Sequence, residues 1–145
     1  MAEYATEVEI DATPEEVFRY LTEPSAMVQW MGQSAVLEAV PDGRFEVDVN
    51  GVPIRGRYVE LDPPHRLVVS WGAEGNDVLP PGSTRLEFTL TPTASGTQLR
   101  LVHSELPEDE AAKHAEGWMH FLSRLRIAAA GGDAGADDWL PEGDQ

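Results

Sequence analysis

The sequence predicts an α+β fold in which an antiparallel sheet wraps around one long C-terminal helix. Three observations lead to this fold class. Between residues 33 and 104, apolar and polar residues alternate in short runs separated by turn signals, which is typical of antiparallel strands. Over residues 111–125, apolar residues recur at helical spacing. The whole chain has 145 residues, the length of one ordinary domain.

The first predicted element is a strand at residues 4–10, where apolar and acidic side chains alternate. Two short helices are expected to follow it. Thr13 is a good N-cap, and Pro14 suits the first position of a helix. Pro24 should end this helix and begin a second short one that runs towards Trp30.

Six further strands are predicted after these helices. They cover residues 35–40, 45–49, 54–61, 67–71, 86–90 and 99–103. Asn50 and Gly51, between the second and third of them, form the strongest short hairpin signal in the chain. Most connections are short, apart from a loop over residues 72–82, so the strands should form an antiparallel meander.

The last predicted element is the long helix. Pro107 and three acidic residues stand at its expected start, where the helix dipole favours negative charge. A Gly-Gly pair at 131–132 should end it. The remaining residues are rich in acids and glycine, so we expect one domain at 1–130 and an acidic flexible tail at 131–145.

Composition narrows the function classes. Ten Lys and Arg against 26 Asp and Glu give a formal net charge of −16. Such an acidic surface argues against binding to nucleic acid and to anionic lipid, both of which attract basic proteins. The N-terminus lacks signal-peptide features, and no apolar run has the length of a membrane span. We therefore expect a cytoplasmic protein that binds neither nucleic acid nor membrane.

Several motifs carry a family resemblance. They are Ile10–Phe18 (IDATPEEVF), Gln29–Gly32 (QWMG), Gly56–Leu67 (GRYVELDPPHRL), Ser70–Trp71, Thr97–His103 (TQLRLVH) and His114–Trp118 (HAEGW). In this order they resemble the domain related to the C-terminal part of activators of the heat-shock-protein-90 ATPase, within the START-like (SRPBCC) superfamily. The resemblance implies a helix-grip fold, with six or seven antiparallel strands around the C-terminal helix and two short helices after the first strand.

The same resemblance implies a cavity between the sheet and the terminal helix that binds a small apolar or aromatic ligand. The strand alternation predicts these inward-facing side chains: Phe45, Val47, Val49, Leu67, Val69, Trp71, Phe88, Leu90, Leu99 and Leu101. The residues expected to contact the ligand are Trp30, Tyr58, Glu60, Trp71, Phe88, His103, His114, Trp118 and Phe121. In the alternative interpretation, these side chains fill the space completely as a packed core.

Two other functions remain open at this point. Glu60 and His103 could act as acid and base in a cyclase-like or hydrolase-like enzyme of the same fold, or simply form a buried hydrogen bond. A chaperone-associated interaction module is the other alternative, and a homodimer is plausible. We assign no catalytic residue and expect no cofactor. We also expect no metal, because the sequence has no cysteine and no closely spaced ligand motif.

Overall fold

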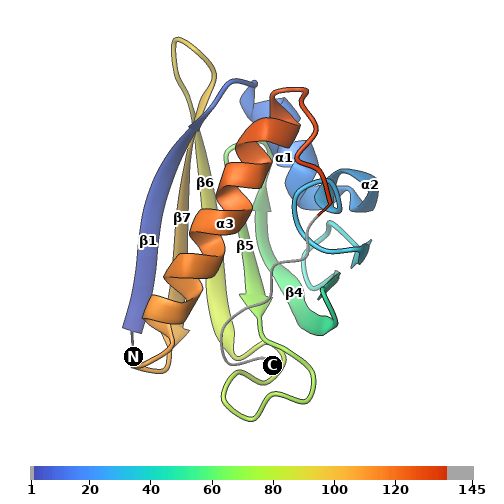
Figure 1. The fold of residues 1–145 in the computed structure, drawn as a ribbon, viewed down its shortest axis with the longest axis vertical. Coiled ribbons are helices and arrows are strands. Elements are labelled where there is room, and N and C mark those ends of the chain that lie inside the picture. The colour runs from blue at the N-terminus through green and yellow to red at the C-terminus, as the bar shows by residue number, and fades with distance from the viewer. Residues whose placement is uncertain (1, 137–145) are drawn as a thin grey trace.

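The computed structural model describes residues 2–136 and has the predicted α+β architecture (Figure 1). The elements follow one another as β1 (Ala2–Ile10), α1 (Pro14–Thr22), α2 (Pro24–Met27), β2 (Ser34–Leu37), β3 (Arg44–Val49), β4 (Val52–Asp62), β5 (Arg66–Trp71), β6 (Thr84–Pro92), β7 (Thr97–Leu106) and α3 (Ala111–Ala129).

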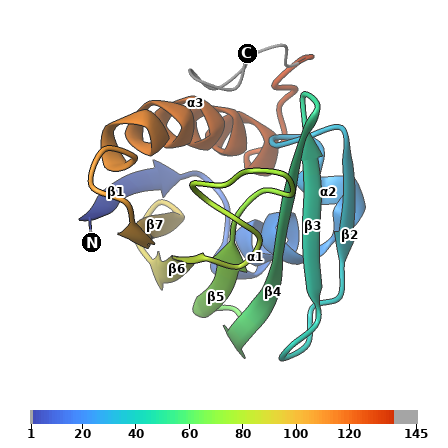
Figure 2. The ribbon, with the colours of Figure 1, turned by 90° about the horizontal axis from the view of Figure 1, so that it is seen from below.

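One seven-stranded sheet organises the molecule. Its strand order is β1-β7-β6-β5-β4-β3-β2, and all neighbouring strands are antiparallel. The strands from β2 to β7 form the predicted meander. The last of them, β7, pairs with the first strand of the chain, β1. The sheet curls so that α3 lies along its open side, while α1 contacts β6 and α2 contacts β2 (Figure 2). The helix-grip fold, with two short helices after the first strand, is therefore confirmed.

The β3–β4 hairpin forms where the Asn50-Gly51 signal predicted it. Both turn residues have positive φ, 49° for Asn50 and 89° for Gly51, and Val49 pairs with Val52 across the turn. Asn and Gly tolerate this left-handed backbone at low cost, and such turns match the twist of the two strands.

Apart from β2, the strands extend one to three residues beyond their predicted bounds. Two other boundaries differ from the prediction for local reasons. β2 ends at Leu37 instead of residue 40, because the backbone N–H of Val40 bonds to the carbonyl of Glu38 and bends the chain out of the ladder. Helix α3 begins at Ala111 instead of Pro107. The residues before it form a turn, closed by a 2.9 Å bond from the Glu110 N–H to the Pro107 carbonyl.

The core lies between the concave sheet face and the helices. All ten side chains predicted to face inward are less than a tenth exposed. The side chains that meet them from α2, the turn after it and α3 are also buried, namely Met27, Trp30, Trp118, Phe121 and Leu122. The apolar side chains that alternate along the strands and those at helical spacing in α3 therefore face one common apolar interior.

The segment that follows α3 is held against the body by Arg124. This largely buried guanidinium donates to the carbonyls of Trp30, Ala134 and Gly135 at 2.9–3.0 Å. The tail expected over 131–145 falls mostly on residues 137–145, outside the described part of the chain, so its flexibility and the domain boundary at residue 130 stay predictions.

Candidate functional site

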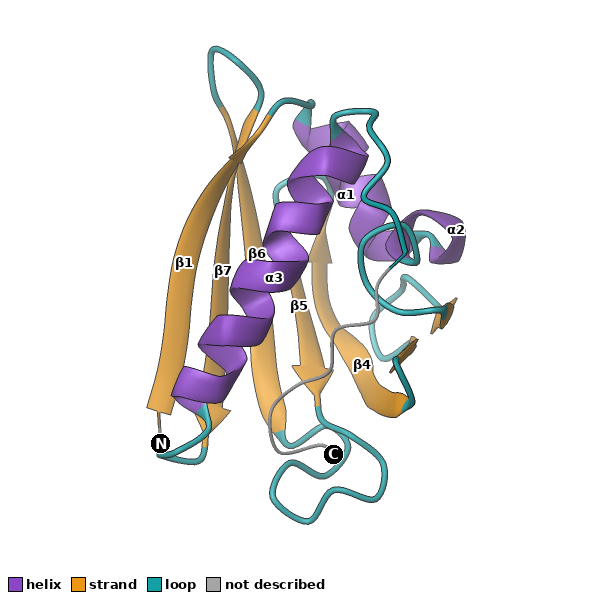
Figure 3. Cartoon of the chain, in the orientation of Figure 1, coloured by secondary structure: helices purple, strands orange, loops and turns teal. Residues whose placement is uncertain are grey.

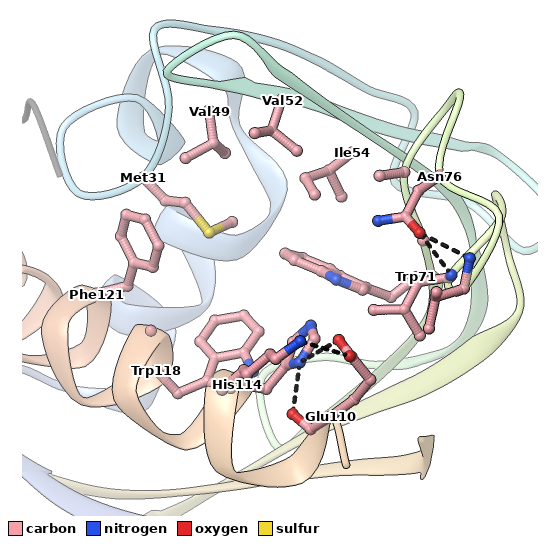
Figure 4. Close-up of a pocket in the computed structure, with 16 residues that line it drawn as sticks. Met31, Val49, Val52, Ile54, Trp71, Asn76, Glu110, His114, Trp118 and Phe121 are labelled. Atoms are coloured by element: carbon pink, nitrogen blue, oxygen red, sulfur yellow. Dashed lines mark hydrogen bonds and ion pairs between the residues drawn. The ribbon is translucent and has the colours of Figure 1, made fainter. Parts of the chain in front are cut away.

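A cavity of about 210 Å³ lies between the start of α3, the β5–β6 loop and the inner face of β3 and β4 (Figure 4). Figure 3 shows that this loop lies at the same end of the sheet as the start of α3. The apolar lining consists of Met31, Val49, Val52, Ile54, Trp71, Ala73, Val78, Leu79, Trp118 and Phe121. Gly72 and Gly117 complete it, together with the polar residues Asn76, Glu110, Lys113 and His114.

Two indoles form the aromatic part of the wall. Trp71 stands at the end of β5 and Trp118 on the inner face of α3, with ring centroids 5.2 Å apart and planes tilted by 54°. Phe88 packs edge-on against Trp118 from behind, at 6.4 Å. Edge-on pairs are a favourable arrangement of aromatic rings, so the contact with Phe88 supports the Trp118 part of the wall.

The polar groups of α3 form a corner of the cavity, made of Glu110, Lys113 and His114 and called here the polar corner. The Lys113 ammonium lies 3.2 Å from one Glu110 carboxylate oxygen. The His114 Nδ1 lies 3.9 Å from the other oxygen and donates to the Glu110 backbone carbonyl at 3.0 Å. Lys113 and His114 project from the first turn of the helix and Glu110 from the N-cap before it, and such positions i, i+3 and i+4 share one face.

Asn76 is the polar residue contributed by the β5–β6 loop. Its side-chain oxygen accepts the backbone N–H groups of Val78 and Leu79, at 2.8 and 2.9 Å. These bonds hold the loop in a tight turn and bring both apolar residues to the cavity, as Asx turns commonly do.

Four of the nine predicted ligand residues line the cavity. They are Trp71, His114, Trp118 and Phe121. Trp30, Tyr58, Phe88 and His103 are buried but lie outside the cavity lining, packed in the core behind it. The cavity is therefore displaced towards the β5–β6 loop relative to the centre of the sheet.

Trp30 and Tyr58 have a structural contact that sequence reasoning did not predict. The Trp30 indole donates to the Tyr20 carbonyl at 2.9 Å, and the Tyr58 hydroxyl donates to the Leu21 carbonyl at 3.0 Å. Carbonyls in the last turn of a helix lack partners within the helix, so the two aromatic side chains complete the end of α1. Burial raises the pKa of Tyr58, which stays a neutral donor.

The prediction that Glu60 faces inward is wrong. The pairing of β4 with β5 shifts register between Tyr58 and Glu60, as in a β-bulge. This shift turns Glu60 to the outer face, where its carboxylate is about half exposed and pairs with Arg66. Glu60 and His103 therefore do not form the buried acid–base pair that the enzymatic alternative required.

His103 is completely buried and has both ring nitrogens satisfied. They lie 3.1 Å from the Trp118 indole nitrogen and 2.8 Å from the Thr84 hydroxyl. Burial, and to a lesser extent the electrostatic effect of the neighbouring His114 imidazole, lowers the pKa of His103 to about 3, so the His103 ring is neutral. This environment matches the hydrogen-bonded structural role that was the alternative to catalysis.

Several lining residues were missed by the sequence reasoning, above all Asn76, Glu110 and the apolar residues of the loop. The Gly75-Asn76 pair just before Val78 and Leu79 is a sequence signal for a turn, and it could have indicated the role of Asn76. Glu110 was placed at the helix start only as a favourable charge. Within residues 2–136, no cluster of three or more acidic or histidine side chains could hold a metal.

The chain is similar to a known family over most of its length. The family model of Activator of Hsp90 ATPase homolog 1-like proteins matches residues 11–130. An AHSA1-like protein from Rhizobium etli, solved in solution by NMR, is 40% identical with a TM-score of 0.75, covering 97% of this chain and 89% of that one. No protein with a curated description matches the chain.

Two other solved structures have the same fold. DynU16, from the dynemicin biosynthetic locus, is 25% identical with a TM-score of 0.82, and the match covers 95% of this chain and 51% of that one. The Aha1 dimer from Colwellia psychrerythraea is 22% identical with a TM-score of 0.80, covering 91% and 98%. No helix within the described residues is long and apolar enough to cross a bilayer.

The family match covers the first two helices, the meander and α3, the elements that build the cavity. The resemblance seen in the sequence motifs is thereby confirmed. This chain belongs to the Activator of Hsp90 ATPase homolog 1-like family, within the START-like superfamily.

Proposed function

We propose that this protein binds a small apolar or aromatic molecule in the cavity between the sheet, the β5–β6 loop and α3. The observation that carries the proposal is the cavity itself: a space of about 210 Å³ with a mostly apolar wall that includes two indoles. Small-molecule sites usually combine such a wall with a few polar groups. The polar corner and Asn76 supply these groups.

The volume limits the size of the ligand. An apolar cavity of about 150 Å³ is enough to bind benzene, whereas drug-sized ligands occupy pockets of roughly 300–1,000 Å³. A space of about 210 Å³ therefore suits a molecule with one or two rings. DynU16, whose name places it in a biosynthetic locus for a small molecule, supports this class of function by similarity.

A titration with a model ligand tests the proposal. We expect ethylbenzene and indole to shift the indole N–H resonances of Trp71 and Trp118 saturably in NMR spectra of the full chain. Val49→Phe should fill the cavity from β3 and abolish these shifts, because Val49 is buried and lines the space. Val59→Phe adds the same ring at a half-exposed position of β4 and should bind like the wild type.

Thermal unfolding of both variants shows whether they fold, and Ala73→Leu provides a second way to fill the cavity. Absence of saturable shifts with either probe in the wild type would overturn the proposal. Unchanged binding in a folded, cavity-filled variant would also contradict it, because the probe would then bind elsewhere.

Three further expectations stay predictions. A homodimer is tested by light scattering during size-exclusion chromatography, and a chaperone partner by a pull-down at low salt, where an acidic surface attracts basic partners most strongly. The cytoplasmic location is tested by cell fractionation. A monomer, an empty pull-down or a secreted protein would contradict the respective expectation.

A further inference from the structure

The polar groups of the cavity come from two separate walls, and hydrogen bonds fix their orientation. Asn76 belongs to the β5–β6 loop, whereas Glu110 and His114 belong to the start of α3. A ligand between these walls meets defined donors and acceptors. The hydrogen-bonding pattern of the cavity can therefore be compared with that of candidate ligands.

The amide nitrogen of Asn76 is a hydrogen-bond donor on the loop wall. The side-chain oxygen faces two backbone N–H groups at 2.8 and 2.9 Å, so oxygen and nitrogen cannot be exchanged. Figure 4 shows the nitrogen pointing away from these bonds and towards the apolar side chains of the cavity. It has no hydrogen-bond partner within residues 2–136, so it can donate to an acceptor atom of a ligand.

The helix wall offers acceptors. The His114 Nδ1 lies 3.0 Å from the Glu110 backbone carbonyl, which can only accept, so Nδ1 carries the hydrogen. In the neutral ring, Nε2 is then a hydrogen-bond acceptor. Among the described contacts this nitrogen has no partner, and the Glu110 carboxylate beside it adds further acceptor positions.

The charges of the polar corner already compensate one another. The Lys113 ammonium pairs with the Glu110 carboxylate at 3.2 Å, and the Glu110 side chain is only 11% exposed. A charged ligand would lose its hydration on entering this mostly apolar space, and the ion pair that it meets there has no net charge. Because burying an unpaired charge is costly, the cavity favours an uncharged ligand.

Building on the proposed function, we propose that the cavity selects uncharged aromatic molecules that present an acceptor oxygen to Asn76 and a hydroxyl hydrogen to the polar corner. Phenolic ketones are the simplest class with this pattern. The aromatic ring would pack against Trp71 and Trp118, the carbonyl oxygen would accept from the Asn76 amide, and the hydroxyl would donate to the His114 Nε2 or the Glu110 carboxylate.

Calorimetric titration of the full chain with matched probes tests this inference. The probes are para-hydroxyacetophenone with both groups, acetophenone with the acceptor only, para-ethylphenol with the donor only, ethylbenzene with neither, and the charged para-hydroxybenzoate. We expect para-hydroxyacetophenone to bind most tightly and para-hydroxybenzoate most weakly. Each hydrogen-bonding group should improve affinity over ethylbenzene by about threefold to tenfold, the usual net effect of one hydrogen bond.

Two variants assign the hydrogen bonds. Asn76→Asp keeps an oxygen for the two backbone N–H groups but removes the donor, so affinity for acetophenone should fall about tenfold or more. His114→Phe removes the Nε2 acceptor and should weaken para-ethylphenol binding. In both variants each affinity is compared with that of ethylbenzene, which makes no hydrogen bond and therefore reports the change in cavity shape alone.

The outcomes separate the two proposals. If ethylbenzene and the phenolic ketone both fail to bind the wild type, the proposed function is wrong. If all neutral probes bind equally well, or if Asn76→Asp weakens ethylbenzene as much as acetophenone, the cavity binds apolar molecules without the selectivity inferred here. Tight binding of para-hydroxybenzoate would contradict the preference for uncharged ligands.

Discussion

The indole nitrogen of Trp118 donates a hydrogen bond to Nδ1 of His103 across 3.1 Å, and this bond fixes the tautomer of the imidazole. An indole N–H can only donate, so Nδ1 is unprotonated and Nε2 carries the hydrogen. Nε2 then donates to the Thr84 hydroxyl, which in turn donates to the Trp71 carbonyl, each at 2.8 Å. His103 thus connects the two tryptophans of the cavity wall without lining the cavity.

The neutral state of His103 should make stability depend on pH. The pKa is lowered from 6.5 to about 3 on folding, so between these values the unfolded chain binds a proton that the folded protein excludes. The contribution of the neutral His103 to the free energy of unfolding is therefore fully present above pH 6.5. It decreases by about 1.4 kcal/mol per pH unit as the pH falls from 6.5 towards 3.

His103→Gln isolates this effect, because an amide offers one acceptor and one donor but does not titrate. We expect its free energy of unfolding, measured by urea denaturation between about pH 4 and pH 6, to change less with pH than that of the wild type. The carboxylates titrate in both proteins and cancel in the difference. Equal pH dependence of the two proteins would contradict the buried, neutral state of His103.

Tyr58→Phe should destabilise the fold although it leaves the ring in place. The substitution removes the donor to the Leu21 carbonyl and leaves that buried acceptor unsatisfied, at a cost of about 1–3 kcal/mol. Tyr4→Phe is the matched control, because within residues 2–136 the Tyr4 hydroxyl has no hydrogen-bond partner. Urea denaturation should show the loss only for Tyr58→Phe, and equal stability of the two variants would contradict the role of this bond.

Gly56→Ala should disturb the contact between β4 and β5. A Cβ at this position would lie 1.8 Å from the backbone oxygen of Ser70, so the strands would have to move apart. We expect a loss of at least about 2 kcal/mol in the free energy of unfolding, at the upper end for overpacked sites. Val59→Ala, at a half-exposed position of the same strand, should cost less than about 1 kcal/mol; a smaller effect for Gly56→Ala would contradict the close approach.

Arg124→Met should release the segment after α3. The variant loses donors to the carbonyls of Trp30, Ala134 and Gly135, whereas Arg126→Met loses one bond to the exposed Glu9 carbonyl. Hydrogen exchange by mass spectrometry should show faster exchange at residues 133–136 in Arg124→Met only. Stability should fall by about 2–3 kcal/mol, as for bonds from charged donors. Unchanged exchange in this variant would show that other contacts hold the segment.

The sequence predicted the inner face of the sheet well, because alternation is a local property that burial on one side enforces. Phe45 in β3 and Trp71 in β5 lie where this rule places them. The same rule failed at Glu60, since one irregularity in the pairing of β4 reverses the faces of the residues after it. No residue near Val59 is of a type that would indicate this shift in register from the sequence.

The cavity was less predictable than the core. Trp118 and Phe121 follow from helical spacing, but spacing does not show which buried aromatic residue adjoins empty space. Trp30 is buried outside the cavity lining, where its indole donates to the Tyr20 carbonyl, a contact set by how α1 packs. Asn76 lies in a loop without periodicity, so its position depends on tertiary contacts that no pattern encodes.

The closeness of Trp71 and Trp118 gives the protein an intrinsic optical signal. At a centroid separation of 5.2 Å and an interplanar angle of 54°, the transition dipoles of the two indoles couple and should produce an exciton couplet in the circular dichroism spectrum. A molecule bound as proposed would lie against both rings, and any change in their separation or tilt would alter the couplet. Occupancy can thus be followed spectroscopically in the unlabelled protein, even for ligands that have no chromophore.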